Sequence, residues 1–442
     1  MSSLNVISRM LQRKNTASGT ETATSWRSRL RGHTPSVSFE DHPALGTLRM
    51  LTSAAQRFGI GDPFFKVHEG AGGHHTQIEG REYLNFSHYN YLGLNGHPAV
   101  NAAAQEALAR YGTSAGASRL VAGERPVQRA LEKALADLYG VEACVVFVSG
   151  HATNISAIST LFGPRDLIVH DSLIHNSVLE GIRLSGATRR SFAHNDLQQL
   201  DSLLTELRHG YERALIVVEG LYSMDGDLPD LPALQKIKSR HKAFLMVDEA
   251  HALGVLGDTG RGLAEHYGLG GDAADIWMGT LSKTLAGCGG YIAGSQALID
   301  ILKFAAPGFV YSVGLSPVLA AASLKALQIM QREPERVLLL RERASLFLSL
   351  AREAGLDVGT SQGCAVIPII VGSSRKAISL SNQLFDAGIN VQPIIHPAVE
   401  EKAARLRFFI SAMHSEADIR QACRVLSQAV RGKAPGREAE DA

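Results

Sequence analysis

The chain has 442 residues, enough for two or three domains with a large buried core. Hydrophobic residues make up 45% and charged residues 20%, a balance that excludes disordered and collagen-like chains. Lys and Arg total 44 against 43 Asp and Glu, so no charge excess points to nucleic acid. No apolar run approaches the ~20 residues of a transmembrane helix. The four cysteines are far apart, which favours reduced thiols in a cytoplasmic protein over disulfides or a zinc site.

Residues 1–36 differ in composition from the rest of the chain. They carry six basic residues against a single acid, Glu21, and many Ser and Thr. This pattern is typical of an organelle transit peptide or of a flexible tail. Because the segment lacks a clear amphipathic helix, the tail is the favoured interpretation. The polar residues 432–442 predict a second flexible tail.

Short apolar runs then alternate with segments of helical period. The runs predict strands at 143–148, 167–170, 214–219, 243–248, 276–278 and 291–293. The periodic segments between them predict helices at 127–139, 153–162, 197–208 and 231–240. Continuous apolar strands separated by helices indicate βαβ units and a mainly parallel sheet buried on both faces.

After about residue 332 the pattern changes to that of a smaller α+β domain. The predicted elements there are helix 334–354, strand 365–371, helix 377–387, strands 390–394 and 406–411, and helix 417–430. The predicted organisation is an N-terminal extension (1–45), a segment packing on the core (46–95), a large domain (96–330), a small domain (331–431) and a tail (432–442).

A carboxylate, Asp248, ends the predicted strand 243–248 and begins the run Asp-Glu-Ala-His. Open α/β sheets bind ligands at this carboxyl edge. An unpaired buried charge costs several kcal/mol, so Asp248 is expected to have a cationic partner. A structural arginine and a protonated ring nitrogen of a cofactor both satisfy this expectation.

A lysine, Lys283, follows the predicted strand 276–278 in the run Gly-Thr-Leu-Ser-Lys-Thr. Most lysines are solvated on the surface. This one leaves a buried strand among hydroxyl-bearing and small residues, a setting that lowers the pKa of a lysine and allows a Schiff base with a carbonyl.

A Schiff-base lysine and an aspartate for a pyridinium nitrogen are the two requirements of pyridoxal 5′-phosphate (PLP). The phosphate also needs amide donors, which a helix N-terminus supplies. Ser149-Gly150-His151-Ala152 follows the predicted strand 143–148 and opens a helix. Such a turn alone fits any strand–helix connection, but together with Asp248 and Lys283 it indicates a PLP site.

Eight stretches in order extend this pattern across roughly residues 55–430. They are Tyr89 to Leu94, Gly116 to Leu120 with Gly123, Ser149 to Asn154, Asp171 to Leu179, Tyr222 to Asp227, Asp248 to His251, the lysine run, and Arg405-Leu406-Arg407 before Ser411-Ala412. In these the chain resembles the α-oxoamine synthases, fold-type-I PLP enzymes. The resemblance implies a large mainly parallel-sheet α/β/α domain, a smaller C-terminal α+β domain, and a homodimer with shared active sites.

The resemblance also implies roles for individual residues around the cofactor ring. Lys283 is expected to hold PLP covalently and to act as acid and base at Cα. Asp248 is expected to pair with the pyridine nitrogen, and His175 to stack on the ring, which makes these three the catalytic residues. His251 and Ser223 are expected to hydrogen-bond the phenolic oxygen of the cofactor.

Further roles concern the phosphate and the substrate. The resemblance assigns phosphate contacts to Thr280 and Ser282, to the amides of Gly150 and His151, and to Ser312 of the other subunit. Arg407 is expected to clamp the amino-acid carboxylate with its two-pronged guanidinium. Without the resemblance, Arg407 reads as a strand-edge salt bridge, and His175 as a hydrogen-bonded loop histidine. No metal ion is expected.

The implied activity is the decarboxylative condensation of serine, alanine or glycine with an acyl thioester, carried on coenzyme A or an acyl carrier protein. Its products are an α-amino ketone, CO2 and a free thiol. Within this activity the chain departs from the common family pattern. Most members have Ser-Asn-Asp before Tyr-Leu-Gly, whereas this chain has His88-Tyr89-Asn90, with Tyr89 at a substrate-binding position.

The run Tyr89-Asn90-Tyr91 is similar to bacterial serine palmitoyltransferases and favours their reaction. The second arginine of those enzymes is missing from residues 393–396, and Ala252 stands where serine-specific members commonly have Ser. Reactions like those of 8-amino-7-oxononanoate synthase or 2-amino-3-ketobutyrate ligase therefore stay open as alternatives.

Two further classes of function are compatible with the scaffold. One is another PLP reaction, aminotransfer or decarboxylation, because fold does not fix function. The other is a non-catalytic partner subunit, against which Lys283, Asp248 and His175 argue. The N-terminal segment is a candidate contact for a carrier protein.

Overall fold

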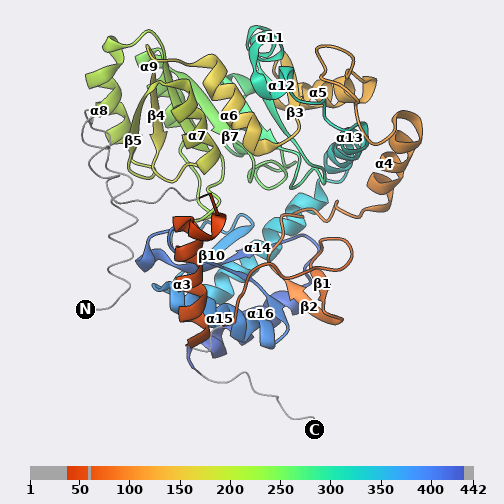
Figure 1. The fold of residues 1–442 in the computed structure, drawn as a ribbon, viewed down its shortest axis with the longest axis vertical. Coiled ribbons are helices and arrows are strands. Elements are labelled where there is room, and N and C mark those ends of the chain that lie inside the picture. Colours follow the sequence, from red (N-terminus) through yellow and green to blue (C-terminus); the bar gives the residue numbers. More distant parts are fainter. Residues whose placement is uncertain (1–36, 58–60, 433–442) are drawn as a thin grey trace. The chain divides into compact units, whose positions relative to one another are not determined.

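The computed structural model describes residues 37–57 and 61–432, so the predictions for tails 1–36 and 433–442 lie outside the described residues. The chain divides into two compact units, Met1–Asp62 and Pro63–Ala442. In the first unit, a short 3-10 helix, η1 (Phe39–Asp41), precedes helix α3 (Pro43–Arg57) (Figure 1). The second unit contains the sheets described below.

A seven-stranded sheet forms the centre of the second unit, in the order β3-β9-β8-β7-β6-β4-β5. The strands are β3 (Ala143–Phe147), β4 (Leu167–Asp171), β5 (Thr188–Phe192), β6 (Ala214–Glu219), β7 (Phe244–Asp248), β8 (Ile276–Thr280) and β9 (Gly290–Gly294). β9 runs antiparallel to β3 and β8, and every other neighbouring pair is parallel.

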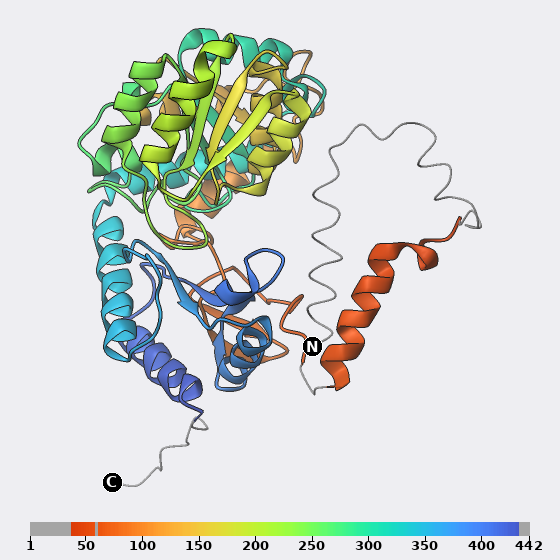
Figure 2. The ribbon, with the colours of Figure 1, turned by 90° about the vertical axis from the view of Figure 1, so that its left-hand side faces the viewer.

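Helices cover both faces of this sheet (Figure 2). One face packs on α6 (Gly150–Leu161), α7 (Asn176–Ser185) and α11 (Gln296–Ala305). The other packs on α5 (Pro126–Tyr139), α8 (Leu197–Leu207), α9 (Leu231–His241) and α13 (Pro317–Arg332). Because successive side chains of a strand point to opposite faces, strands covered on both sides need continuous apolar sequence. The predicted α/β/α architecture with a mainly parallel sheet is confirmed.

The edge strand β5 was not predicted from the sequence. It reads Thr-Arg-Arg-Ser-Phe, and Arg189 and Arg190 are exposed. An edge strand has a neighbour on one side only and tolerates charged residues, so its composition carries no apolar signal. Helix α4 (Pro98–Tyr111), which packs against α13, is also absent from the elements predicted from the sequence.

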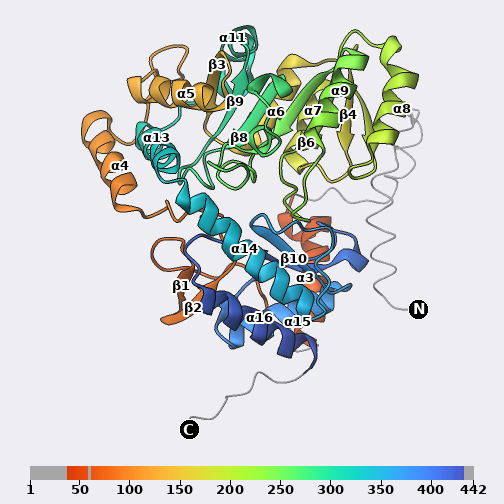
Figure 3. The same ribbon diagram turned by 180° about the vertical axis from the view of Figure 1, so that it is seen from behind.

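The smaller α+β part begins with the long helix α14 (Glu335–Glu353), which packs against α16 (Glu416–Val430) (Figure 3). An antiparallel sheet, β10-β13-β12, packs against the helices of this part. Its elements are β10 (Val366–Ile370), α15 (Ser374–Asp386), β12 (Gln392–Ile394) and β13 (Arg405–Phe409).

The chain preceding the large domain contributes to a further small sheet. Strands β1 (His75–Ile78) and β2 (Arg81–Asn85) form a hairpin, and β2 pairs in parallel with β11 (Ile389–Asn390). This sheet therefore joins residues 75–85 to residues 389–390 of the small domain. Across residues 37–57 and 61–432, no helix combines the length and apolarity that crossing a membrane requires.

Candidate active site

Lys283 lies in a tight loop between β8 and β9. The loop is closed by hydrogen bonds from Ala286 N to Lys283 O (3.0 Å) and from Leu281 N to Gly289 O (2.9 Å). Burial lowers the pKa of Lys283 to about 8, although the carboxylates of Asp248 and Glu219 act in the opposite direction. A lysine with this pKa is partly neutral near physiological pH and is a competent nucleophile towards an aldehyde.

Asp248 ends β7 at the same edge of the sheet. Its Oδ1 accepts a hydrogen bond from Ala250 N (3.0 Å), and its Oδ2 accepts one from Asn154 Nδ2 (2.9 Å). Asp248 is 5% exposed and forms no ion pair with any residue that the structure describes. The structural-arginine partner is therefore not found there, which leaves the protonated ring nitrogen as the expected cation.

A chain of polar side chains connects Asp248 to His175. Asn154 on α6 donates to Ser177 Oγ (2.9 Å), and Ser177 Oγ donates to His175 Nδ1 (2.7 Å). His175 is the N-cap of α7, where its Nδ1 also accepts from Ser177 N (3.3 Å). Burial lowers the pKa of His175, with Lys283 adding to the effect and Asp248 opposing it. The ring is thereby held neutral in a fixed orientation.

His251 follows Asp248 in a buried position against Tyr91. The Tyr91 hydroxyl and His251 Nδ1 are joined by a hydrogen bond (2.7 Å). Burial lowers the pKa of His251 well below its ordinary value. With Tyr91 as the donor in this bond, the neutral imidazole carries its proton on Nε2 and can donate from that atom. This is the hydrogen-bonding character that a phenolic oxygen requires.

The predicted phosphate-binding residues come from two turns that touch. Ser149 caps α6, and Gly150 and His151 supply the first amides of this helix, which have no acceptor within it. A Cβ atom at Gly150 would lie 3.0 Å from Thr280 Oγ1, so glycine permits the close approach of the turn to β8. Thr280 Oγ1 also lies 3.2 Å from Ser282 Oγ.

Two arginines on β13 have different surroundings. Arg405 is buried and binds Asp225 Oδ1 (2.6 Å) and Met224 O (2.9 Å), which is a structural ion pair. Arg407 donates from Nη1 to Ser223 O (2.9 Å) and lies over the Phe409 ring, with 4.6 Å from Cζ to the centroid. Its Nε is buried without a partner in the described chain. Arg407 forms no salt bridge there and keeps donors for a carboxylate.

Tyr89 forms an aromatic wall beside the lysine. Its ring centroid lies 5.4 Å from Lys283 Nζ and 4.8 Å from the Phe409 ring, in an edge-to-face arrangement. Ser223 lies nearby, with its backbone N–H bonded to Glu219 Oε2 (3.0 Å). Ser312 lies elsewhere, in the loop after α12 (Pro307–Val310) between the exposed Tyr311 and Val313. Its assignment to the other subunit stays a prediction.

Comparison with known proteins bears directly on this arrangement. Residues 81–426 match the family model of class I and II aminotransferases. The 8-amino-7-oxononanoate synthase of Geobacter sulfurreducens is 41% identical over 361 residues, which are 81% of this chain and 92% of that protein. The corresponding enzyme of Symbiobacterium thermophilum is 40% identical over 345 residues, covering 78% and 88%.

A solved serine palmitoyltransferase from Sphingomonas wittichii superposes with a TM-score of 0.85 at 28% identity. The match covers 90% of this chain and 99% of that one. This chain belongs to the α-oxoamine synthases. It is therefore a PLP-dependent acyltransferase of fold type I, a family that joins an amino acid to an acyl thioester.

The residues of this α-oxoamine synthase fit PLP. Within residues 37–57 and 61–432, a buried carboxylate that forms no ion pair, a lysine of lowered pKa and the first amides of α6 beside two hydroxyls match the ring nitrogen, the aldehyde and the phosphate. PLP, once bound, supplies a protonated pyridine ring that withdraws electrons when a bond at the amino-acid Cα breaks. Asp248 would keep that nitrogen protonated, and Lys283 would bind the aldehyde carbon.

Sequence reasoning missed several buried residues of the synthase site. Asn154 and Tyr91 stood in family stretches, but only the structure shows that they orient Asp248 and His251. Glu219 pairs in register with Asp248 on neighbouring strands. Burial and Asp248 raise the pKa of Glu219 to about 8, which keeps its carboxyl largely protonated at neutral pH. The sequence signal that could have identified Glu219 is the same as for Asp248: a carboxylate at the end of a continuously apolar strand.

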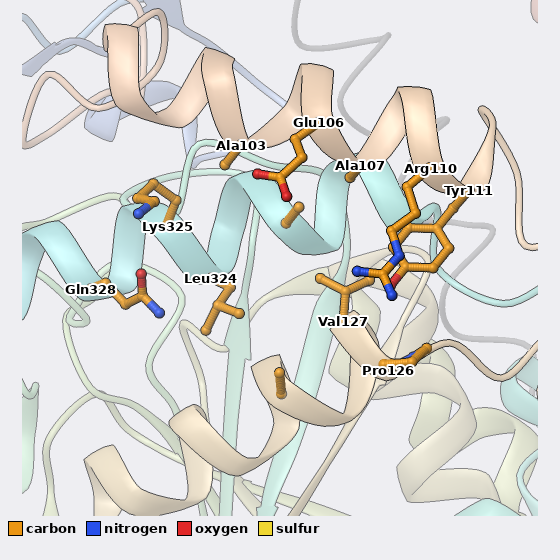
Figure 4. A pocket seen from close by; sticks show the side chains of 12 residues that line it. Ala103, Glu106, Ala107, Arg110, Tyr111, Pro126, Val127, Leu324, Lys325 and Gln328 are labelled. Carbon is orange, nitrogen blue, oxygen red and sulfur yellow. The ribbon is translucent and has the colours of Figure 1, made fainter.

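A cavity of about 320 Å3 lies between α4, α5 and α13 (Figure 4). Its wall combines apolar residues such as Val127 and Leu324 with Glu106, Arg110 and Lys325. None of the residues discussed above for the PLP site lines it. The chemistry of the synthase is thus concentrated at the carboxyl edge of the central sheet.

Proposed function

We propose that this enzyme condenses alanine with an acyl thioester, with loss of CO2, in a reaction like that of 8-amino-7-oxononanoate synthase. The observation that carries the proposal is the 40–41% identity to enzymes of that name over about four fifths of the chain. The product in this name has its amine on the carbon next to a terminal methyl group. When alanine loses its carboxylate, what remains is a carbon that carries an amine and a methyl group, which matches this end of the product.

The proposed mechanism assigns one task to each side chain of the site. Arg407 binds the amino-acid carboxylate and so holds one Cα bond across the plane of the electron-withdrawing ring. Lys283 accepts the Cα proton and later returns it at the same carbon. His175 packs on the ring face. Because its imidazole is neutral, it adds no second positive charge beside the Asp248 carboxylate. Asp248 preserves the proton on the ring nitrogen throughout.

Serine is the second candidate for the amino acid. The run Tyr89-Asn90-Tyr91 and the TM-score of 0.85 to a serine palmitoyltransferase favour it. The segment 393–396, Pro-Ile-Ile-His, argues against serine, because the family resemblance implies an arginine here in serine palmitoyltransferases. The sequence identity to the enzymes named 8-amino-7-oxononanoate synthase, 40–41%, exceeds the 28% identity to the serine palmitoyltransferase, so serine is the second candidate.

The test is a visible absorbance titration of the PLP-loaded protein with alanine, serine and glycine in separate experiments. Saturable band shifts at the lowest concentration with alanine support the proposal, and a clear preference for serine or glycine contradicts it. Thiol release from acyl-coenzyme A thioesters with the preferred amino acid then establishes acyl transfer. Release of a keto acid or a simple amine instead indicates aminotransfer or decarboxylation.

We place the enzyme in the cytoplasm. Cys144, Cys288, Cys364 and Cys423 form no disulfide with one another. Unpaired thiols are typical of reducing compartments.

A further inference from the structure

A second carboxyl group, that of Glu219, lies at the same sheet edge as Asp248. Glu219 ends β6 and pairs in register with Asp248 on the neighbouring strand β7. Its Oε2 accepts a hydrogen bond from Ser223 N (3.0 Å). Its Oε1 is buried and makes no hydrogen bond to any residue in the ranges 37–57 and 61–432. The mechanism proposed for the enzyme assigns no task to this group.

The Glu219 carboxyl is largely uncharged at neutral pH. Burial raises its pKa to about 8, and the carboxylates of Asp248 and Asp171 act in the same direction. Lys283 and the bond from Ser223 N oppose the rise. Asp248 is then left as the negative charge beside the lysine. Glu219 can therefore be replaced by glutamine without a change of charge.

Stability does not explain a carboxyl group at this position. A buried polar group that makes a single hydrogen bond costs free energy. A well-packed apolar side chain of similar volume, such as leucine, would avoid that cost. A buried acid of shifted pKa beside a reactive lysine is typical of a functional site.

The Ser223 peptide connects Glu219 to Arg407 on β13. The Ser223 N–H donates to Glu219, and the Ser223 carbonyl oxygen accepts from Arg407 Nη1 (2.9 Å). Within the part of the chain that the structure describes, no other oxygen accepts a hydrogen bond from Arg407. The direction of the guanidinium thus depends on the orientation of one peptide, and Glu219 fixes that orientation.

We propose that Glu219 is a positioning residue for the amino-acid substrate, which holds the Ser223 peptide and, through it, Arg407 in the orientation that receives the substrate carboxylate. This inference rests on the proposed function, because it takes Arg407 as the carboxylate clamp. Arg405 binds Asp225 Oδ1 in the same turn (2.6 Å), so the turn keeps a second attachment when Glu219 is replaced.

The matched variants are Glu219→Leu and Glu219→Gln. Leucine has a similar volume but offers the Ser223 N–H no acceptor, whereas glutamine is neutral and keeps an oxygen for it. Glu206→Leu makes the same exchange at an exposed position on α8 and is the control. Melting curves by circular dichroism establish that the variants are folded, and Glu219→Met replaces the leucine variant if that variant is not.

The first measurement is the amino-acid Kd of the PLP-loaded protein, from the visible absorbance shift. The amino acid is whichever of alanine, serine and glycine the wild type binds most tightly. In Glu219→Leu we expect this Kd to rise about tenfold, because the clamp loses its orienting hydrogen bond. The thioester KM at saturating amino acid should stay within about twofold of wild type. Glu219→Gln should recover most of the affinity, and Glu206→Leu should match the wild type.

The second measurement separates positioning from a general structural role. It determines kcat/KM for the amino acid from thiol release below saturation, with and without Arg407→Ala. Glu219→Leu should lower this ratio about tenfold when Arg407 is present. In the Arg407→Ala background it should lower the ratio less than about twofold, because residues that act through one another are not additive.

Two results overturn the inference while leaving the proposed function intact. One is a folded Glu219→Leu variant with the amino-acid affinity of the wild type. The other is an equal loss of kcat/KM in both backgrounds, which would show that Glu219 does not act through Arg407. A wild type that prefers serine or glycine contradicts only the proposed alanine reaction. A PLP-loaded wild type that binds none of the three amino acids overturns both.

Discussion

Lys283 and Asp248 lie at one buried edge, yet burial has different consequences for them. The amine responds by losing part of its basicity, with a pKa of about 8. The carboxylate is stabilised by two hydrogen bonds, from Asn154 and from the backbone of Ala250. An amine that is partly neutral near physiological pH, next to a buried and hydrogen-bonded carboxylate side chain, is the combination that binding of a PLP aldehyde and its pyridinium requires.

Replacement of Lys283 by alanine is expected to reduce turnover at least about 1000-fold, because it removes both the covalent attachment and the base at Cα. The fold and the oligomeric state should not change. The measurements are thiol release and the visible spectrum of the purified protein. Lys325→Ala, on the wall of the cavity between α4, α5 and α13, is the matched control and should behave as wild type. Substantial turnover in the Lys283 variant would contradict the mechanism.

The lowered pKa of Lys283 predicts how the apoprotein captures PLP as the pH changes. Only the neutral amine attacks the aldehyde, so the capture rate should rise with pH and level off above about 8. An unperturbed lysine would level off only near its ordinary value of about 10.4. Stopped-flow absorbance after mixing with PLP measures the rate. A midpoint above pH 10 would contradict the assigned environment of the amine.

Asp248→Asn is expected to lower kcat about 100-fold or more, because a neutral amide does not keep the ring nitrogen protonated. The side chains have the same shape, so hydrogen bonding to Ala250 N can persist, while the bond from Asn154 requires a rearrangement. Steady-state kinetics at saturating amino acid measures the effect. Asp137→Asn, at an exposed position on α5, is the control for loss of one carboxylate. A variant with wild-type kcat would remove Asp248 from the catalytic role.

At the scale of elements, the sequence predicted the interior of the large sheet well. The strands ending in Glu219 and Asp248 were located to within one residue, because both of their faces are buried and their sequence is continuously apolar. Elements with one exposed side were missed, as the arginines of β5 show. The position of the site follows from parallel strands ending at a common edge. Contacts between distant segments, such as Tyr91 with His251, are set by tertiary packing and leave no local pattern.

A histidine joins three loops around this edge of the sheet. His194 Nδ1 lies 3.0 Å from Asp171 Oδ1, and its Nε2 lies 2.9 Å from Asp227 Oδ2. Thr360, which precedes β10, donates to the same Asp227 oxygen (2.8 Å). Burial opposes protonation of His194, but the bonds to the two carboxylates outweigh it and raise its pKa to about 10. The cluster therefore links the loop after β5 to the small domain through a charged imidazole.

This cluster predicts a pH-dependent stability. The pKa of His194 is higher in the folded protein than in the unfolded chain, where it is about 6.5. Its contribution is then fully present below pH 6.5 and declines as the pH rises towards 10. His194→Gln should lower the free energy of unfolding by about 3 kcal/mol at pH 6. In the same variant, the free energy of unfolding measured by urea denaturation should fall less between pH 6.5 and 10 than it does in the wild type. His209→Gln, at an exposed position, is the control and should retain the wild-type profile.

At the scale of the whole molecule, an apolar surface surrounds Ser312. Two loops meet there, joined by a hydrogen bond from Gly314 N to Ala117 O (2.9 Å). They expose Val121 (81%) and Tyr311 (86%), together with Leu120 and Val313. Large apolar side chains gathered on one surface are typical of interaction sites. A second copy of this chain is the expected partner, because the family resemblance places Ser312 against the phosphate bound by the other subunit.

The double variant Val121→Asp, Tyr311→Asp tests this arrangement. Two buried charges at an interface cost far more than the apolar contacts they replace, so a dimer should dissociate to monomers. The monomers should also retain PLP less tightly, since each site loses the partner's Ser312. Analytical ultracentrifugation measures the first effect and equilibrium dialysis against PLP the second. Phe244→Ser changes an exposed apolar residue at the opposite edge of the sheet and should leave both unchanged. A double variant that stays dimeric would place the interface elsewhere, whereas monomers with undiminished PLP affinity would show that each site is complete within one chain.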